Sequence, residues 1–235
     1  MPAPTLYVVA TPIGNLEDIT LRALRLLGGV DCVIAEDTRV TKKLLDRYGI
    51  VKPLIALHAR STERQVATAL ERVRESSACA LVTDAGTPTI SDPGGTFIAR
   101  VRCELPEVHI EVIPGPSALT AALSIAGVDA AEFIFLGFLP HKKGRETALR
   151  DIAASERTVV CYESPHRVMK TLTALALLLD PTRRLVVCRE LTKLHEEVVA
   201  GSATDLLEHF TRDPSKVRGE FVLIIEHPRA AHYIV

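Results

Sequence analysis

The sequence lacks tryptophan altogether, and aromatic residues make up only 4% of it. It also lacks a long apolar segment, because its longest uninterrupted apolar run, Ala174–Leu179, is far shorter than the roughly 20 residues of a membrane-spanning helix. The N-terminal stretch has no basic region, and Pro12 and Gly14 interrupt its apolar residues too early for a signal peptide. These absences predict a cytoplasmic protein with no membrane partner.

The sequence has almost no excess of charge of either sign. Its 28 basic and 29 acidic residues give a net charge of −1, with a slightly acidic first half and a slightly basic second half. Proteins that coat nucleic acid or membranes through a general field are normally strongly basic. This balance excludes that class and leaves room for a local basic patch.

Closely spaced cysteines and the common nucleotide or hydrolase motifs are missing as well. The five cysteines form no CxxC pair, and their odd number predicts reduced thiols that are mostly buried. The sequence contains no GxGxxG, GxxxxGK[ST], GxSxG or HExxH motif. The simplest dinucleotide, phosphate-loop, serine-hydrolase and zinc-protease interpretations are therefore excluded, and no metal is expected.

What is present is a chain rich in aliphatic residues, with 47% hydrophobic residues and a mean hydropathy of +0.20 over 235 residues. Short apolar runs alternate with segments of helical periodicity, which indicates an α/β protein with mainly parallel sheet. The strands are expected at Leu6–Ala10, Cys32–Ala35, Leu54–Leu57, Ala80–Thr83, Ile110–Ile113, Phe133–Phe138, Thr158–Tyr162, Leu185–Cys188 and Phe221–Ile225.

One position breaks this alternation and predicts a domain boundary. The sequence PGPS, residues 114–117, places two prolines and a glycine between a strand and a helix, and Ser117 is a suitable N-cap. We therefore expect two α/β domains, residues 1–114 and 115–235.

The loops that follow the strands of the first half are rich in small, stiff and polar residues. They read ATPIGN at 10–15, AEDTR at 35–39, TDAGTP at 83–88 and PGPS at 114–117. One such loop alone is more often an ordinary turn. Because ligands bind at the carboxyl ends of strands in open α/β sheets, four such loops predict a shared ligand site.

Charged residues follow several strands, and their roles stay open at this level. Glu36, Asp37 and Arg39 suit general-base or ribose-binding work, and they equally suit an internal ion-pair network. The basic loop at residues 137–145 could clamp phosphates or could simply be solvated. Further charged loops follow at 163–167 and 189–197.

Taken together and in this order, the motifs resemble a known family. The segments LYVVATPIGNLEDITLRAL, AEDTR, LVTDAGTPTISDPG, IPGPSALTAAL, GFLPHKKGR, YESPHR, RELTKLHEE and GEFVLIIE, spread over about residues 5–226, are similar to the ribosomal RNA small-subunit methyltransferase I family. That family belongs to the tetrapyrrole-methylase superfamily and methylates a cytidine ribose 2′-oxygen in 16S rRNA with S-adenosylmethionine.

The resemblance implies two α/β domains of tetrapyrrole-methylase type, with S-adenosylmethionine in the inter-domain cleft, in a homodimer whose partner is 16S rRNA or the small ribosomal subunit. It also implies cofactor-binding residues, which by their place in the motifs are Pro12, Gly14, Asp84, Ala85, Gly86, Ser117, Ala118, Tyr162, Glu163, Gly219 and Glu220.

For the reaction implied by this resemblance, the ribose hydroxyl attacks the cofactor methyl in line, and a general base assists. The candidates for catalysis are Glu36, Asp37, Lys193 and Glu196. The candidates for holding the RNA backbone are Arg39, Lys142, Lys143, Arg145 and Arg167.

The sequence departs from the family pattern after His58, where Ala-Arg-Ser-Thr-Glu replaces the usual asparagine and glutamate. It also ends soon after Glu226, without the C-terminal helical extension of many members. Two alternatives remain: a C-methyltransferase acting on a tetrapyrrole precursor, and a non-catalytic module that binds S-adenosylmethionine or RNA and assists ribosome assembly.

Overall fold

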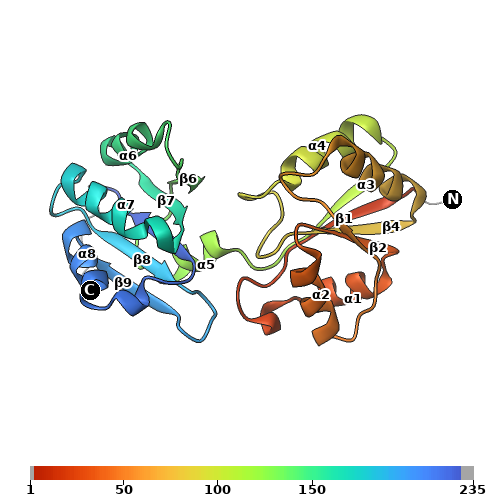
Figure 1. Cartoon of the computed structure of the whole chain (residues 1–235), viewed down its shortest axis with the longest axis horizontal. Coiled ribbons are helices and arrows are strands. Elements are labelled where there is room, and N and C mark those ends of the chain that lie inside the picture. Colours follow the sequence, from red (N-terminus) through yellow and green to blue (C-terminus); the bar gives the residue numbers. More distant parts are fainter. Residues whose placement is uncertain (1–2, 229–235) are drawn as a thin grey trace. The chain divides into compact units, whose positions relative to one another are not determined.

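The chain divides into two compact units, Met1–Ser117 (unit 1) and Ala118–Val235 (unit 2), in a computed structural model that describes residues 3–228 (Figure 1). The division falls close to the boundary predicted after residue 114. None of the helices in residues 3–228 is both long and apolar enough to cross a membrane.

Unit 1 is built on one parallel sheet, with the strand order β3-β2-β4-β1-β5. Its strands are β1 (Thr5–Val9), β2 (Cys32–Ala35), β3 (Leu54–Ala56), β4 (Ala78–Val82) and β5 (His109–Ile113). Its helices are η1 (Leu16–Asp18), α1 (Leu21–Gly29), α2 (Thr38–Arg47), α3 (Glu63–Glu75) and α4 (Gly94–Glu104).

Helices cover both faces of this sheet (Figure 1). Val33 and Ala35 of β2 pack on the side of α1 and α2, whereas Cys32 and Ile34 pack on the side of α3 and α4. Since every residue of β2 is buried, its apolar run shows no polar alternation, as is typical of a parallel strand covered on both faces.

Unit 2 has a second sheet, with the strand order β6-β7-β10-β8-β9. Its strands are β6 (Phe133–Phe138), β7 (Thr158–Glu163), β8 (Leu185–Arg189), β9 (Glu197–Gly201) and β10 (Phe221–Ile225). Its helices are α5 (Ala118–Ile125), α6 (Arg145–Ala154), α7 (Pro165–Leu178), α8 (Ala203–Arg212) and η2 (Pro214–Lys216). Helices α6, α7 and α8 share one hydrophobic core with the sheet, and α5 contacts β10.

The α/β class is confirmed, but the prediction of mainly parallel sheet is wrong for unit 2. Only β6 and β7 pair in parallel there, while β10 runs antiparallel to both of its neighbours. Strand β9 was not predicted; it pairs antiparallel with β8 after a loop too short for a parallel crossover. As an edge strand it is only partly buried, so its apolar signal is weak.

This mixed topology sets which loops of unit 2 lie near one another. Phe221, the first residue of β10, stands opposite both Glu163 at the end of β7 and Arg189 at the end of β8. Phe138, the last residue of β6, stands opposite Tyr162. The loops that follow β6, β7 and β8 therefore lie at the same edge of the sheet as the segment preceding β10.

Candidate functional site

In unit 1, hydrogen bonds to backbone groups hold together the loops after β1, β4 and β5. The amide of Thr11 donates to the carbonyl of Gly86 at 2.9 Å, and the amide of Gly86 donates to the carbonyl of Thr11 at 3.0 Å. The Thr87 hydroxyl donates to the carbonyl of Pro116 at 3.1 Å. The predicted residues at 12–14, 84–86 and 117 are thus brought to one edge of the sheet.

Gly86 occupies a backbone conformation that favours glycine, and a Cβ atom there would make ordinary contacts with its neighbours. Its φ is +84°, and a Cβ atom there would lie 3.4 Å from Ile13 Cγ2 and 3.7 Å from the carbonyl oxygen of Pro116. Gly14 and Ala85 beside it are exposed, whereas Pro12 is buried. Hydrogen bonds therefore fix the backbone of these loops, while Gly14 and Ala85 remain accessible to a small ligand.

Acidic side chains gather at the ends of β2 and β4. The Thr83 hydroxyl donates to Glu36 Oε2 at 3.0 Å, and the backbone amide of Asp37 donates to Asp84 Oδ1 at 2.8 Å. Burial raises the pKa of both Glu36 and Asp84 above their ordinary values. A carboxylate with a raised pKa is a better proton acceptor near neutral pH, so Glu36 is the stronger of the two predicted bases in unit 1.

Asp37 has a different role in this structure. It caps helix α2, and its carboxylate binds the guanidinium of Arg39 through two nitrogens, with Arg39 Nη2 at 2.6 Å from Oδ2. The hydrogen bonds from the Arg39 side chain hold the pKa of Asp37 well below its usual range. Such a carboxylate is a weak base, while the Arg39 side chain remains 87% exposed.

In unit 2, Glu163 is the centre of a buried polar cluster. Its side chain is inaccessible to solvent and contacts Arg145 Nη2 at 3.2 Å and Arg167 Nη2 at 2.8 Å. The Thr171 hydroxyl donates to the same carboxylate at 2.6 Å. The predicted RNA contacts of Arg145 and Arg167 do not fit this arrangement, because both guanidiniums neutralise an internal carboxylate. The Glu163 side chain is likewise closed to a cofactor.

The exposed basic residues of that loop are Lys142 and Lys143, which follow the end of β6. The loop starts from a fixed point, since Arg167 Nη1 donates to the carbonyl of Leu139 at 2.8 Å and Arg145 Nη1 donates to that of Pro140 at 3.3 Å. The two arginines thus position the loop that carries the lysines.

The segments before β10 and after β8 form a second polar cluster at this edge of unit 2. Lys193 Nζ lies 2.8 Å from Glu190 Oε1 and 2.9 Å from Glu220 Oε2. Partial burial opposes the charge on Lys193, but the hydrogen bonds to Glu190 and Glu220 outweigh it and raise its pKa. A lysine held in its protonated form cannot accept a proton, so its predicted use as a general base does not fit.

Glu190 was missed by the sequence analysis, although it lies in the segment RELTKLHEE. It adopts a left-handed backbone conformation, with φ +52°, and its carboxylate accepts a hydrogen bond from the amide of Glu220 at 3.0 Å. The sequence feature that could have indicated its pairing with Lys193 is the spacing, since Glu190 lies three positions before that lysine. Glu196 is exposed, and its carboxylate accepts a hydrogen bond from the amide of Thr192 at 2.6 Å.

The remaining predicted cofactor residues of unit 2 have varied surroundings. Tyr162 is half-buried, and burial raises its pKa although the nearby backbone of Leu119 has the opposite effect. Gly219 has φ +84° and lies against the Glu190 side chain. Ala118 opens helix α5 and is partly exposed. Within residues 3–228, no group of three or more His, Cys, Asp or Glu side chains could hold a metal ion.

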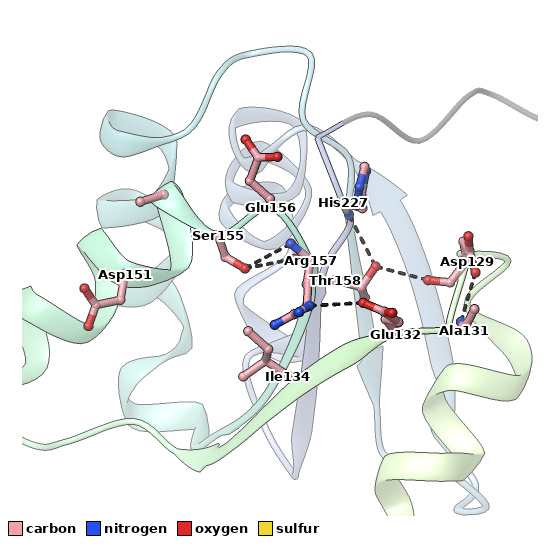
Figure 2. Close-up of a pocket in the computed structure, with 11 residues that line it drawn as sticks. Asp129, Ala131, Glu132, Ile134, Asp151, Ser155, Glu156, Arg157, Thr158 and His227 are labelled. Carbon is pink, nitrogen blue, oxygen red and sulfur yellow. Dashed lines mark hydrogen bonds and ion pairs between the residues drawn. The ribbon is translucent and has the colours of Figure 1, made fainter.

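An open cavity of about 660 Å³ lies elsewhere in unit 2, around the first residues of β6 and β7 (Figure 2). Arg157 pairs there with Glu132 at 3.1 Å, and the Thr158 hydroxyl donates to the carbonyl of Asp129 at 3.1 Å. None of the predicted site residues lines it. Its other charged residues include Asp151 and Glu156, and this excess of carboxylates disfavours phosphate groups.

Comparisons with known proteins agree with the family suggested by the motifs. Residues 5–207 match the tetrapyrrole (corrin/porphyrin) methylase family. The ribosomal RNA small subunit methyltransferase I of Haemophilus influenzae is 43% identical, over 94% of this chain and 78% of its own length. The protein of the same name from Thermotoga maritima is 40% identical, over 94% of this chain and 97% of its own length.

Solved structures agree on the fold. The uroporphyrin-III C-methyltransferase from Thermus thermophilus, complexed with S-adenosylhomocysteine, aligns with a TM-score of 0.66 at 21% identity. The alignment covers 96% of this chain and 99% of that one. The tetrapyrrole-methylase fold predicted from the motifs is confirmed. With relatives of this identity matched over nearly its whole length, the chain is a methyltransferase that belongs to the ribosomal RNA small subunit methyltransferase I family.

Proposed function

We propose that this protein transfers the methyl group of S-adenosylmethionine to the ribose 2′-oxygen of a cytidine in 16S rRNA of the small ribosomal subunit. The observation that carries the proposal is the 43% identity with a protein named ribosomal RNA small subunit methyltransferase I, over 94% of this chain. The choice of ribose and of cytidine rests on the motif resemblance. The site of action would then be the cytoplasm, where small subunits are found.

The loops of unit 1 fit this cofactor chemically. Gly86 supplies the positive-φ backbone of the loop, and Asp84 offers a carboxylate to the ammonium and hydroxyl groups of such a ligand. Backbone carbonyls in such loops can accept weak C–H···O contacts from a polarised methyl group. In unit 1 we assign Pro12, Gly14, Asp84, Ala85, Gly86 and Ser117 to the cofactor.

In unit 2, we assign Ala118, the half-buried Tyr162, and the backbone of Glu163, Gly219 and Glu220 to the cofactor. The Glu163 carboxylate itself is taken up by Arg145 and Arg167. The cluster of Glu190, Lys193 and Glu220 would fix the backbone at Gly219, since Glu190 bonds both Lys193 and the amide of Glu220.

When bound, S-adenosylmethionine supplies an electrophilic methyl group and a neutral thioether leaving group. The protein's task is to hold the ribose hydroxyl in line and to take up its proton. Orientation of this kind can contribute roughly 7–11 kcal/mol. We assign proton uptake to Glu36, which is half-buried and hydrogen-bonded to Thr83, with the exposed Glu196 as the alternative in unit 2.

For the RNA, we assign backbone contacts to the exposed Lys142 and Lys143, with Arg39 at the edge of unit 1 as a further candidate. Replacing both lysines with alanine should weaken RNA binding and reduce the slope of log K against log salt by roughly 1.4. Lys170→Ala, an exposed change on α7, is the control. An unchanged slope in the double variant would show that this loop is only solvated.

We also propose a homodimer. The edge strand β6 supports it, because Phe133 and Leu136 are large apolar side chains that stay 38% and 41% exposed there. Edge strands with exposed apolar residues favour association with another chain. Sedimentation of the purified protein tests this proposal: a monomer at micromolar concentration would contradict it.

The function is tested with labelled S-adenosylmethionine and small ribosomal subunits from cells that lack the activity. The label should enter the RNA and remain on a ribose after digestion to nucleosides. Label on a base, or on a tetrapyrrole precursor offered in parallel, would contradict the proposal. Cofactor binding with no transfer to any substrate would favour a non-catalytic module.

A further inference from the structure

Phe138 is a large aromatic side chain left at the surface of unit 2. It is 56% exposed and ends strand β6, in a chain with six phenylalanines and no tryptophan. Its ring centroid lies 5.5 Å from that of Tyr162, which in turn lies 5.0 Å from Phe135. An exposed ring that extends a row of aromatic side chains is a surface on which another planar group can stack.

A local irregularity of the strand places this ring. The pairing of Phe135 with Val160 is followed by that of Phe138 with Tyr162, so β6 contains one residue more than β7 over this interval. In a regular ladder Gly137 would stand opposite Tyr162. Because of the bulge, in which Gly137 has φ +61°, Phe138 stands opposite Tyr162 instead of Gly137. Bulges commonly re-aim a side chain next to a functional site.

The ring next to Phe138 is fixed before any ligand binds. Tyr162 is half-buried, with its hydroxyl near the backbone of Leu119 at the start of α5. Edge-to-face packing against both Phe135 and Phe138 further limits its movement. A rigid aromatic surface lowers the conformational cost of binding.

The charges beside this ring fit a polyanion. The exposed Lys142 and Lys143 follow in the next loop, whose beginning is anchored by Arg145 and Arg167. An exposed aromatic ring close to flexible cations is the combination with which proteins bind unpaired nucleotides, the ring for the base and the cations for phosphates.

We infer that Phe138, backed by Tyr162, stacks on an unpaired base of the RNA substrate. The inference rests on the proposed function, because it names the group that holds a base of the same RNA. Phe138 is a substrate-positioning residue and takes no part in proton transfer. Its loss should therefore raise the KM for the small subunit and leave kcat nearly unchanged.

The absence of tryptophan allows a direct test. Phe138→Trp introduces a single indole, and we titrate it with a short single-stranded oligoribonucleotide that contains cytidine and, separately, with S-adenosylhomocysteine. The RNA should quench the indole emission equally well in the absence and in the presence of saturating S-adenosylhomocysteine. Leu177→Trp, on α7 and 83% exposed, is the control and should respond to neither.

Loss of the RNA response once S-adenosylhomocysteine is bound would place the ring against the cofactor and overturn the inference. So would the lack of any RNA response in a Phe138→Trp protein that still methylates small subunits, an outcome that leaves the proposed function standing. If the unaltered protein methylates no RNA, the proposed function itself fails.

A second pair of variants tests the energetic role. Phe138→Ala should weaken RNA binding about 10-fold, as loss of one base-stacking contact does, with S-adenosylhomocysteine affinity unchanged. Phe138→Tyr keeps a ring and should restore RNA binding. A change of oligomeric state in Phe138→Ala would mean that the ring belongs to a subunit interface, and would overturn the inference.

Discussion

At the scale of single residues, the environment decides what each charged side chain can do. Asp37 and Glu36 are neighbours in the sequence, but Arg39 holds the pKa of Asp37 low while burial raises that of Glu36. Arg145 and Lys143 lie in the same basic segment, but one is buried against Glu163 and the other is exposed. Charge in a sequence therefore does not separate an ion-pair partner from a ligand-binding residue.

Glu36→Gln tests the general base. Because a base acts only when ionised and burial raises the pKa of Glu36, activity should fall as the pH drops through that raised pKa. The variant should lose about 10²- to 10⁴-fold in kcat and lose this acid limb of the pH profile. Stopped-time methyl-transfer assays across pH measure both. An unchanged profile in Glu36→Gln would assign the proton to another residue.

Glu163→Gln tests the buried cluster. The change leaves Arg145 and Arg167 near a neutral amide, with both guanidiniums largely removed from solvent. An uncompensated buried charge costs about 3–5 kcal/mol, which denaturant titration would record as a lower free energy of unfolding. The control is Glu132→Gln, whose exposed pair with Arg157 should contribute at most about 1 kcal/mol. Equal effects of the two changes would contradict the structural role of Glu163.

At the scale of elements, the sequence predicted the strands of both units except β9, and the prediction of how they pair failed where long-range contacts decide. The sheet of unit 1 could be predicted because a helix connects each of its strands to the next and returns the chain in parallel. The insertion of β10 between β7 and β8 follows from pairing between distant segments, which leaves no periodic signal. Strand β9 alternates between partly buried and exposed residues and carries only a weak apolar signal.

The candidate site, like the fold, could be predicted from the sequence only in part. The loops of unit 1 could be predicted because glycine and proline after strands identify them directly. The pairing of Glu163 with Arg145 could not, since the two residues come from β7 and α6 and nothing in either motif indicates the other. The role of Glu190 depends on its left-handed backbone, a conformation that a glutamate in a sequence does not suggest.

Gly219→Ala tests how the segment before β10 is held against the loop after β8. A Cβ atom there would lie 2.2 Å from Cδ of Glu190, so the Glu190 side chain and its bond to Lys193 must move. Gly127→Ala is the control in the same unit: its φ is also positive, at +60°, but nothing lies within 4 Å of the added atom. Both changes carry a backbone cost of about 1–2 kcal/mol.

We expect Gly219→Ala to lower the free energy of unfolding by about 1–3 kcal/mol more than Gly127→Ala, because of the added crowding. It should also weaken S-adenosylhomocysteine binding in calorimetry, whereas Gly127→Ala should not. Equal stability and equal binding in the two variants would remove Gly219 from the proposed cofactor residues.

At the scale of the whole molecule, the chain is two units with separate cores. In residues 3–228, the core clusters around Leu6 and around Val9 lie in unit 1, and the cluster around Leu172 lies in unit 2. The near-zero net charge combines a slightly acidic first half and a slightly basic second half. Stability should therefore be a property of each unit, while methyl transfer needs residues that we assign in both.

Because the two units have separate cores, we expect a destabilising substitution in one unit to leave the stability of the other unchanged. In the protein without ligand, Glu163→Gln should speed amide hydrogen exchange in β7, β8 and β10 and leave β1, β2 and β4 as protected as before. Phe97→Ala, which opens a cavity between α4 and the sheet of unit 1, should produce the opposite pattern. Exchange followed by mass spectrometry at peptide resolution distinguishes the two. Faster exchange in both sheets for either variant would show that the units unfold together, because a shared cooperative transition exposes all of their amides at once.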